Sequence, residues 1–124
     1  INNYGNEDIS HITEDFMINL LKGPDDMIPK MVNAIHFNKD KPENKNIIIS
    51  SSKDNMFKVF ENGKWINKEK NETLFDLVDG KYYMLDSFYN EMKDNNIKEF
   101  NTKLKKEDME RYDNFSKEYD KAFM

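Results

Sequence analysis

A carboxylate-and-lysine pattern in the first half of the chain is the arrangement best suited to chemistry. Pro24-Asp25, followed later by Glu43-Asn44-Lys45, matches the Pro-Asp then Glu-x-Lys pattern of metal-dependent nucleases. In such sites two carboxylates hold Mg²⁺, and the lysine polarises the attacking water or the phosphate. This chemistry needs both carboxylates on adjacent strands, whereas we expect Asp25 to open a helix and Glu43 to lie in a loop. Because the pattern is short, a Mg²⁺ nuclease using Asp25, Glu43 and Lys45 is only the second alternative.

A polar loop between a predicted helix and a predicted strand carries the other candidate side chains. It runs from His36-Phe37-Asn38 through Pro42-Glu43-Asn44 to Asn46. Short polar side chains in such a loop either bond local backbone groups or present a binding surface, and the first role is the commoner one. His36 follows an apolar helix face, so we expect a hydrogen-bonded packing histidine rather than a metal ligand.

The residues that other catalytic and metal-binding sites require are missing from this sequence. The chain has no cysteine, so it can form neither a disulfide nor a thiolate zinc site of its own. Two histidines are too few for a histidine-based zinc site, and four glycines form no phosphate-binding loop. The triplet Ser50-Ser51-Ser52 has no strand-turn-helix setting that would make one of them a nucleophile. We therefore predict no metal, no cofactor and no enzymatic activity.

Charge is unevenly distributed along the 124 residues, which carry a net charge of −5. Residues 31–70 hold eight lysines and five acids, for a local charge of 8 − 5 = +3, between acidic flanks. Phosphate contacts accumulate one counterion at a time, so this excess is a weak signal, and a solvated face is the expected role. Direct nucleic-acid binding through residues 39–70 is the first alternative function. Its contacts would be Lys39, Lys41, Lys45, Lys53, Lys58 and Lys64.

Two helices are predicted before this loop. Thr13 is a suitable N-cap for the first, with acids in the following turn, and Gly23-Pro24 ends it. The second helix is expected to open at Asp25 or Asp26 and to bury a stripe at helical spacing. That stripe consists of Ile28, Met31, Val32 and Ile35. Residues 1–12 are turn-prone and polar, which predicts a lead-in.

Three strands follow, over residues 47–51, 56–60 and 64–66. Asn62-Gly63 is a strong two-residue hairpin signal, because both positions of such a turn favour positive φ. Residues 52–55 are also turn-like, so the strands are expected to form a short antiparallel meander. Apolar helix stripes should cover one face of this sheet.

The remainder is predicted to be helical. A long helix should start at Asn71-Glu72-Thr73, with a break or kink near Asp79-Gly80, because glycine costs roughly 1 kcal/mol relative to alanine. From Lys103 a last helix carries a thin aromatic stripe, which packs either on a partner or second copy, or on its own domain. The residues of this predicted oligomer face are Leu104, Tyr112, Phe115, Tyr119 and Phe123.

The predicted fold is therefore α+β: two N-terminal helices, a three-stranded antiparallel meander, then one or two C-terminal helices. We expect residues 1–97 to form the domain, with 1–12 as lead-in. Residues 98–124 should form a C-terminal amphipathic helix that contacts an oligomer or another partner. No run approaches the roughly 20 apolar residues of a membrane span, so no membrane partner is expected.

Several separated blocks, in order, resemble the C-terminal domain of giant-virus (nucleocytoplasmic large DNA virus) C2H2-type zinc-finger proteins. The blocks lie in 4–12, 20–30 and 35–47, with Lys64-Trp65 after the hairpin, so the resemblance spans roughly residues 1–92. In that group the domain follows a zinc finger, a helical or coiled-coil stretch and an Asn-rich linker. The matching positions are Tyr4, Gly5, Asn6, Glu7, His36, Phe37, Asn38, Pro42, Glu43, Asn44 and Asn46.

The resemblance implies structural or partner-contact roles for these positions and brings no catalytic residues. It also implies a large DNA virus and an intracellular setting in the infected host cell, in a cytoplasmic virus factory or the nucleus. Contact with DNA would come mainly through a zinc finger outside this sequence, which begins with Ile1 and is expected to be a piece of a longer protein. The expected function is a non-enzymatic interaction or oligomerisation module, whose partner is a second copy or another viral protein.

Overall fold

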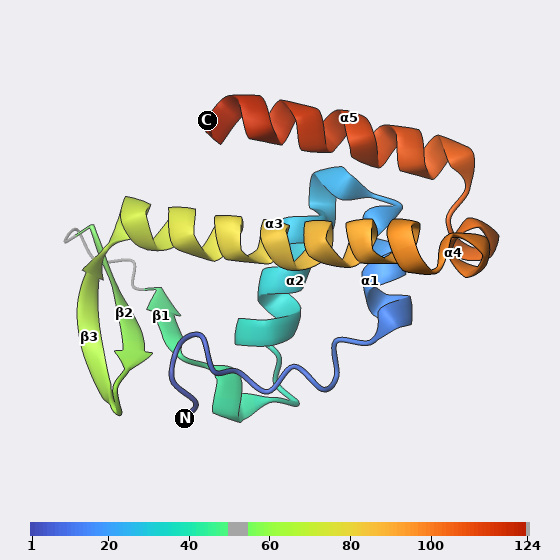
Figure 1. The fold of residues 1–124 in the computed structure, drawn as a ribbon. Coiled ribbons are helices and arrows are strands. Elements are labelled where there is room, and N and C mark those ends of the chain that lie inside the picture. Colours follow the sequence, from blue (N-terminus) through green and yellow to red (C-terminus); the bar gives the residue numbers. More distant parts are fainter. Residues whose placement is uncertain (50–54, 124) are drawn as a thin grey trace. The chain divides into compact units, whose positions relative to one another are not determined.

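The fold is α+β in the computed structural model, which describes residues 1–49 and 55–123. The elements before the sheet are α1 (Glu14–Leu21), α2 (Pro24–His36) and the short 3-10 helix η1 (Pro42–Asn44). The sheet elements are β1 (Ile47–Ile49), β2 (Met56–Glu61) and β3 (Lys64–Glu69). The helices after the sheet are α3 (Lys70–Asn95), α4 (Ile97–Lys103) and α5 (Lys106–Phe123) (Figure 1). The predicted α+β fold, with helices before and after an antiparallel meander, is confirmed.

The chain forms two compact units, each built from two separate stretches. Unit 1 comprises Ile1–Ile12 and Met31–Gly80, and unit 2 comprises Thr13–Lys30 and Lys81–Met124. The boundary expected from the sequence, between residues 97 and 98, does not coincide with these units. Residues 81–97 belong with the C-terminal helices because aromatic side chains pair along the two segments, and such pairing is invisible in local sequence.

The first helix follows its local signals. The Thr13 side chain accepts a hydrogen bond from the Phe16 backbone N–H at 3.1 Å, and acids occupy the first turn. The helix ends at Leu21, with Lys22 as its C-cap directly before Gly23-Pro24, as predicted. The capping oxygen satisfies a backbone donor that the helix leaves without an internal partner, so the start site is determined locally.

The sheet of the described residues has the strand order β1-β2-β3, with both pairings antiparallel. Asn62 and Gly63 both have positive φ, at 53° and 76°, which confirms the predicted hairpin turn. Strand β3 continues to Glu69, beyond the predicted end at residue 66, because its pairing with β2 extends to Met56. The end of the first predicted strand and most of the predicted 52–55 turn lie outside the described residues.

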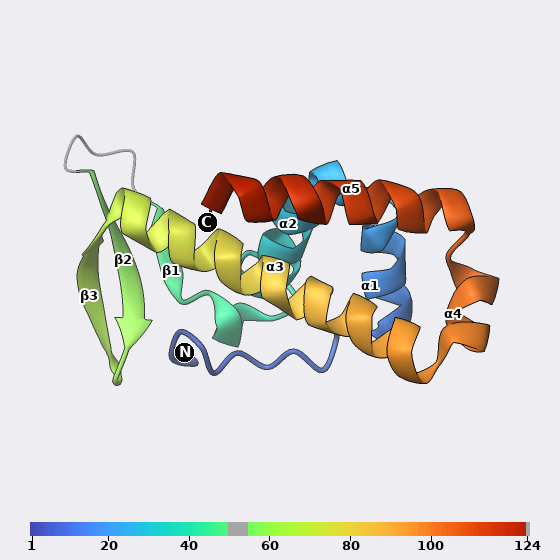
Figure 2. The same ribbon diagram turned by 45° about the horizontal axis from the view of Figure 1, so that its top comes forward.

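The long helix is uninterrupted, so the predicted break near Gly80 is wrong: α3 runs through this position (Figure 2). The flanking side chains of Leu77 and Tyr82 are almost fully buried. Burying each such side chain contributes roughly 1.5–3 kcal/mol, which outweighs the cost of about 1 kcal/mol for one helical glycine.

The predicted single last helix is two helices, α4 and α5, separated at Leu104. Leu104 has an extended backbone, with φ −125° and ψ 118°, and its side chain is buried. Phe100, in α4, is also fully buried, which the sequence analysis did not predict. A buried leucine at the break explains the separation, because the apolar side chain holds the turn against the core of unit 2.

The aromatic stripe of α5 is packed within unit 2. Tyr119 stacks on Tyr82 with ring centroids 3.8 Å apart, and Tyr112 lies 4.2 Å from the Tyr89 ring. The Tyr112 hydroxyl donates to Asp86 Oδ1 at 2.6 Å. Of the predicted oligomer face, Leu104, Tyr112 and Tyr119 are therefore buried inside one chain. Phe115 is half-buried, and Phe123 is 50% exposed.

Because several tyrosines are buried, we predict a sharp fall in the free energy of unfolding at alkaline pH. Burial raises the pKa of Tyr4 to about 12, and burial also raises the pKa values of Tyr82, Tyr89 and Tyr112 above 10. The folded state therefore holds these protons more tightly than the unfolded state. This stabilisation is complete below pH 10 and is lost as the pH rises from 10 through the folded pKa values.

We expect the helical circular dichroism signal to collapse between pH 10 and 12, together with the rise in tyrosinate absorbance. The same absorbance titration in concentrated urea is the control and should be centred near pH 10. Ionisation of all tyrosines near pH 10 with the fold intact would contradict this prediction.

No helix within the described residues is long and apolar enough to cross a membrane.

Candidate functional site

The N-terminal segment of unit 1, which the sequence predicts as a lead-in, is hydrogen-bonded to the loop and to the sheet. The Asn2 backbone N–H donates to the Glu43 carbonyl at 2.7 Å, and the Tyr4 N–H donates to the Phe60 carbonyl at 2.7 Å. Around these two bonds polar side chains gather into what we call the polar corner. Its members are Asn2, Glu7, Asp8, His36, Lys41, Asn44 and Asn46.

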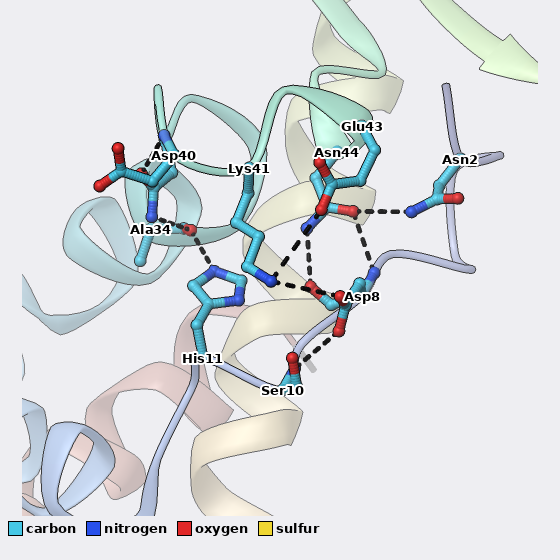
Figure 3. Close-up of polar contacts among 10 residues, drawn as sticks. Asn2, Asp8, Ser10, His11, Ala34, Asp40, Lys41, Glu43 and Asn44 are labelled. Carbon is cyan, nitrogen blue, oxygen red and sulfur yellow. Dashed lines mark hydrogen bonds and ion pairs between the residues drawn. The ribbon is translucent and has the colours of Figure 1, made fainter.

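Asn44 joins the loop to two points of the N-terminal segment (Figure 3). Its side chain is fully buried. The Oδ1 atom accepts from Asn2 Nδ2 at 3.0 Å and from the Asp8 N–H at 2.9 Å, and Nδ2 donates to the Asp8 carbonyl at 2.7 Å. When both the oxygen and the nitrogen of a buried amide form hydrogen bonds, these bonds offset the cost of removing the amide from water, so the side chain can join the two segments.

Asn46 makes the second junction and is also fully buried. Its Nδ2 donates to Glu7 Oε2 at 2.6 Å and to the Asn2 carbonyl at 3.2 Å. Because Nδ2 donates, Oδ1 is the acceptor for His36 Nδ1 at 2.8 Å, so this histidine nitrogen carries a proton. The His36 ring is fully buried and stacks on Tyr4, with centroids 5.7 Å apart.

An ion pair lies at the exposed side of the polar corner. Lys41 Nζ is 3.3 Å from Asp8 Oδ2 and 4.0 Å from Glu43 Oε1. Hydrogen bonds from Ser10 and Lys41 lower the pKa of Asp8 to about 2. Exposed ion pairs contribute little to stability, so this pair orients Lys41 rather than holding the fold.

His11 binds the end of α2 to the N-terminal segment. Its Nε2 lies 2.7 Å from the Ala34 carbonyl and therefore donates to it (Figure 3). The other ring nitrogen, Nδ1, is buried without a hydrogen-bond partner among the described residues. Local sequence gave no signal for His11, Asn2 or Asp8, because their partners lie more than twenty residues away.

The structure brings together only part of the predicted motif. Gly5 has a φ of +93° and donates its N–H to Glu7 Oε2 at 2.9 Å, which places the carboxylate beside Asn46. Asn38 Oδ1 accepts from the Asp40 N–H at 2.9 Å, and Pro42 begins η1. The side chains of Asn6 and Phe37, which belong to the same predicted motif, are exposed.

The residues of the nuclease pattern do not lie on adjacent strands. Asp25 is in the first turn of α2, in unit 2, whereas Glu43 is in η1 and Lys45 follows it, in unit 1. Over residues 1–49 and 55–123, no cluster of three His, Cys, Asp or Glu side chains is arranged to hold a metal ion.

Four of the predicted nucleic-acid contacts, Lys39, Lys45, Lys58 and Lys64, are exposed. None of the four forms a salt bridge with a residue in the described part of the chain. Lys41 is paired as described above. Lys53 lies outside the described residues.

No protein-family model, curated protein or solved structure matches the chain. The resemblance to giant-virus zinc-finger proteins therefore stays a prediction based on the sequence blocks.

Proposed function

We propose that this chain is a non-enzymatic interaction module of a viral, DNA-associated zinc-finger protein. The observation that carries the proposal is the bonding of Asn44 and Asn46. Both amides are fully buried, and their hydrogen bonds hold residues 2–8 against the loop. Buried side chains with these hydrogen bonds stabilise the fold and cannot contact a partner. We therefore assign the function to the exposed surface.

The exposed surface offers large apolar side chains for such contacts. Ile48 and Trp65 in unit 1, and Ile97 and Phe123 in unit 2, are each at least 40% exposed. Single exposed apolar residues are common in monomers. Ile48 and Trp65 lie on the same face of the sheet, which makes this face the stronger candidate for contact. The partner is a second copy of the chain or another viral protein, and DNA contact by the longer protein would come mainly through its zinc finger.

Self-association is the form of this proposal that is simplest to test. We expect the mass measured by light scattering to rise above 14.9 kDa as the protein concentration increases from low to high micromolar. Because Phe123 is one of the exposed side chains offered for this contact, the rise in mass should shift to higher concentration in a Phe123→Ala variant. A strict monomer at high micromolar concentration would remove self-association from the proposal.

Cleavage of nucleic acid would contradict the non-enzymatic proposal itself. The test incubates single-stranded and duplex DNA with millimolar Mg²⁺ and either the natural chain or Glu43→Gln. We expect no difference between the two proteins. Cleavage by the natural chain that disappears in Glu43→Gln would establish the nuclease alternative instead.

A further inference from the structure

Strand β3 forms an edge of the sheet in unit 1 (Figure 1 and Figure 2). In the part of the chain that the structure describes, β2 is the only strand paired with β3, so the other side of β3 has no neighbouring strand. An edge of this kind presents backbone N–H and C=O groups that can pair with another extended chain. The free side of β3 is therefore a surface for a partner's backbone.

A hydrogen bond at the end of β3 shows which backbone groups face this free side. The Lys70 N–H donates to the Asn55 carbonyl at 3.0 Å, and this bond continues the pairing of β3 with β2. Backbone groups alternate between the two sides of a strand. The even-numbered residues of β3 therefore face β2, whereas Trp65 and Asn67 face the free side. Over residues 1–49 and 55–123, no other segment is hydrogen-bonded to the backbone groups of Trp65 or Asn67.

The side chains along this edge are open to solvent. Trp65 is 40% exposed, Lys64 and Asn67 are exposed, and Ile66 is half-buried. Side chains alternate between the faces of a strand, so Lys64, Ile66 and Lys68 share one face, and Trp65 and Asn67 share the other. A strand added at this edge would therefore meet two lysines flanking an isoleucine on one face.

The edge is positively charged on the face that carries these lysines. Lys64 forms no salt bridge with a described residue. The Lys68 ammonium lies 2.9 Å from Glu61, but this acid is on β2, one strand away from the edge, and such exposed pairs are weak. Glu69 lies on the opposite face and already accepts two backbone N–H groups at the start of α3. Acidic side chains are therefore the complement of this face.

A second copy of β3 fits this edge poorly. The antiparallel arrangement that bonds the outward groups of both strands places Trp65 opposite Asn67 of the other copy. The same arrangement places Lys64 opposite Lys68 of the other copy, at both ends of the contact. Like charges directly opposite each other destabilise a pair of strands, and lysines on edge strands prevent such pairing in many proteins. The edge therefore favours an acidic strand over its own copy.

We propose that the free edge of β3 binds an extended acidic segment of another protein as an additional antiparallel strand. The backbone of that segment exchanges hydrogen bonds with Trp65 and Asn67, as in complexes in which a peptide extends a sheet. Acidic residues at alternate positions face Lys64 and Lys68, and an apolar residue between them faces Ile66. This inference rests on the proposed function, an interaction module, and deepens it by stating the chemistry of the partner.

A designed peptide tests the inference directly. The blocked sequence glutamate-threonine-isoleucine-valine-glutamate places its acids opposite both lysines when it runs antiparallel to β3. It is titrated into the 124-residue protein, and the fluorescence of Trp65, the single tryptophan, reports binding. We expect a saturable change. A peptide with lysines in place of both glutamates should bind at least about ten-fold more weakly, because two opposite-charge pairs become like-charge pairs.

Hydrogen exchange of backbone amides locates the contact. In the free protein the amides of Trp65 and Asn67 should exchange fast, because they face solvent, whereas those of Ile66 and Lys68 should be protected by their bonds to β2. The glutamate peptide should slow exchange at Trp65 and Asn67. Protection of these two amides before any peptide is added would show that the edge is already occupied and would overturn the inference.

Variants separate backbone pairing from attraction of charge. Asn67→Pro removes one outward N–H and leaves the bonds to β2 in place, so it should weaken binding about ten-fold or more, whereas Asn67→Ala should bind normally. Lys64→Glu should reverse the preference, so that the lysine peptide binds better than the glutamate peptide. The matched control is Lys117→Glu, at an exposed position of unit 2, which should leave the affinity unchanged. Circular dichroism establishes that each variant is folded.

Three further results would overturn the inference: no fluorescence change with the glutamate peptide, equal binding of the lysine peptide, or normal binding by a folded Asn67→Pro variant. The proposed function has separate readouts, since light scattering and the cleavage assay need no peptide at β3. Failure of peptide binding, with self-association present and cleavage absent, removes only this inference.

Discussion

Replacing Asn46 with alanine is expected to destabilise unit 1 by about 3 kcal/mol, because the buried partners of its amide lose their bonds together. His36 Nδ1 would lose its acceptor, while Glu7 Oε2 and the Asn2 carbonyl would lose their shared donor. The site is fully buried, so water cannot replace these bonds without opening the corner. Urea unfolding followed by the fluorescence of Trp65, which lies in the same unit, measures the change.

Two further variants test whether the lost hydrogen bonds cause the destabilisation expected for Asn46→Ala. Asn46→Asp keeps the size of the side chain but replaces the donor with a carboxylate facing Glu7, so it should destabilise at least as much as alanine. Asn33→Ala makes the same change from asparagine at an exposed position of unit 1 and should stay within about 0.5 kcal/mol of the natural chain. A cost for Asn46→Ala as small as that of Asn33→Ala would show that the polar corner does not hold the unit together.

Truncation of Tyr112 to alanine is expected to cost unit 2 about 3–5 kcal/mol, the range for removing a buried aromatic side chain. The ring is 1% exposed, lies against Tyr89 and donates its hydroxyl to Asp86. Loss of the ring would therefore leave a cavity and an unpaired carboxylate between α3 and α5. Urea unfolding followed by the near-ultraviolet circular dichroism of tyrosine measures this loss.

Tyr112→Phe keeps the ring and removes only the hydrogen bond to a charged group, so it should cost about 1.5–3 kcal/mol. Tyr83→Ala is the matched exposed control and should cost about 1 kcal/mol or less, because it loses only an edge contact with Tyr82. Equal effects of Tyr112→Ala and Tyr83→Ala would mean that the aromatic packing of unit 2 contributes little to its stability.

Elements with local causes were predictable from the sequence. The Thr13 cap and the Asn62-Gly63 turn each depend on residues within three or four positions, and both are present. Two errors arose where burial decided the outcome, at Gly80 and at Leu104. A sequence pattern shows the local cost of glycine, but it does not show which neighbouring side chains the fold will bury.

The candidate site was predictable only in part, for the same reason. His36, Asn44 and Asn46 stood out as polar residues at a helix-to-strand junction, and the structure places all three inside the polar corner. Asn2, Asp8 and His11 did not stand out, because each bonds a residue more than twenty positions away. The ion pair of Glu61 with Lys68 also required the structure, since the two residues lie on different strands that pair only in the folded sheet.

By itself the sequence determined the class of fold, the order of its elements and the turn that joins β2 to β3, since helix caps, hydrophobic period and turn residues act over a few positions. Tertiary structure alone decided that residues 1–12 belong to unit 1, that Tyr112 and Tyr119 of α5 are buried within one chain, and that Trp65 is exposed. The physical reason is that hydrogen bonds and apolar burial between distant segments depend on which surfaces meet, and no local pattern encodes that choice.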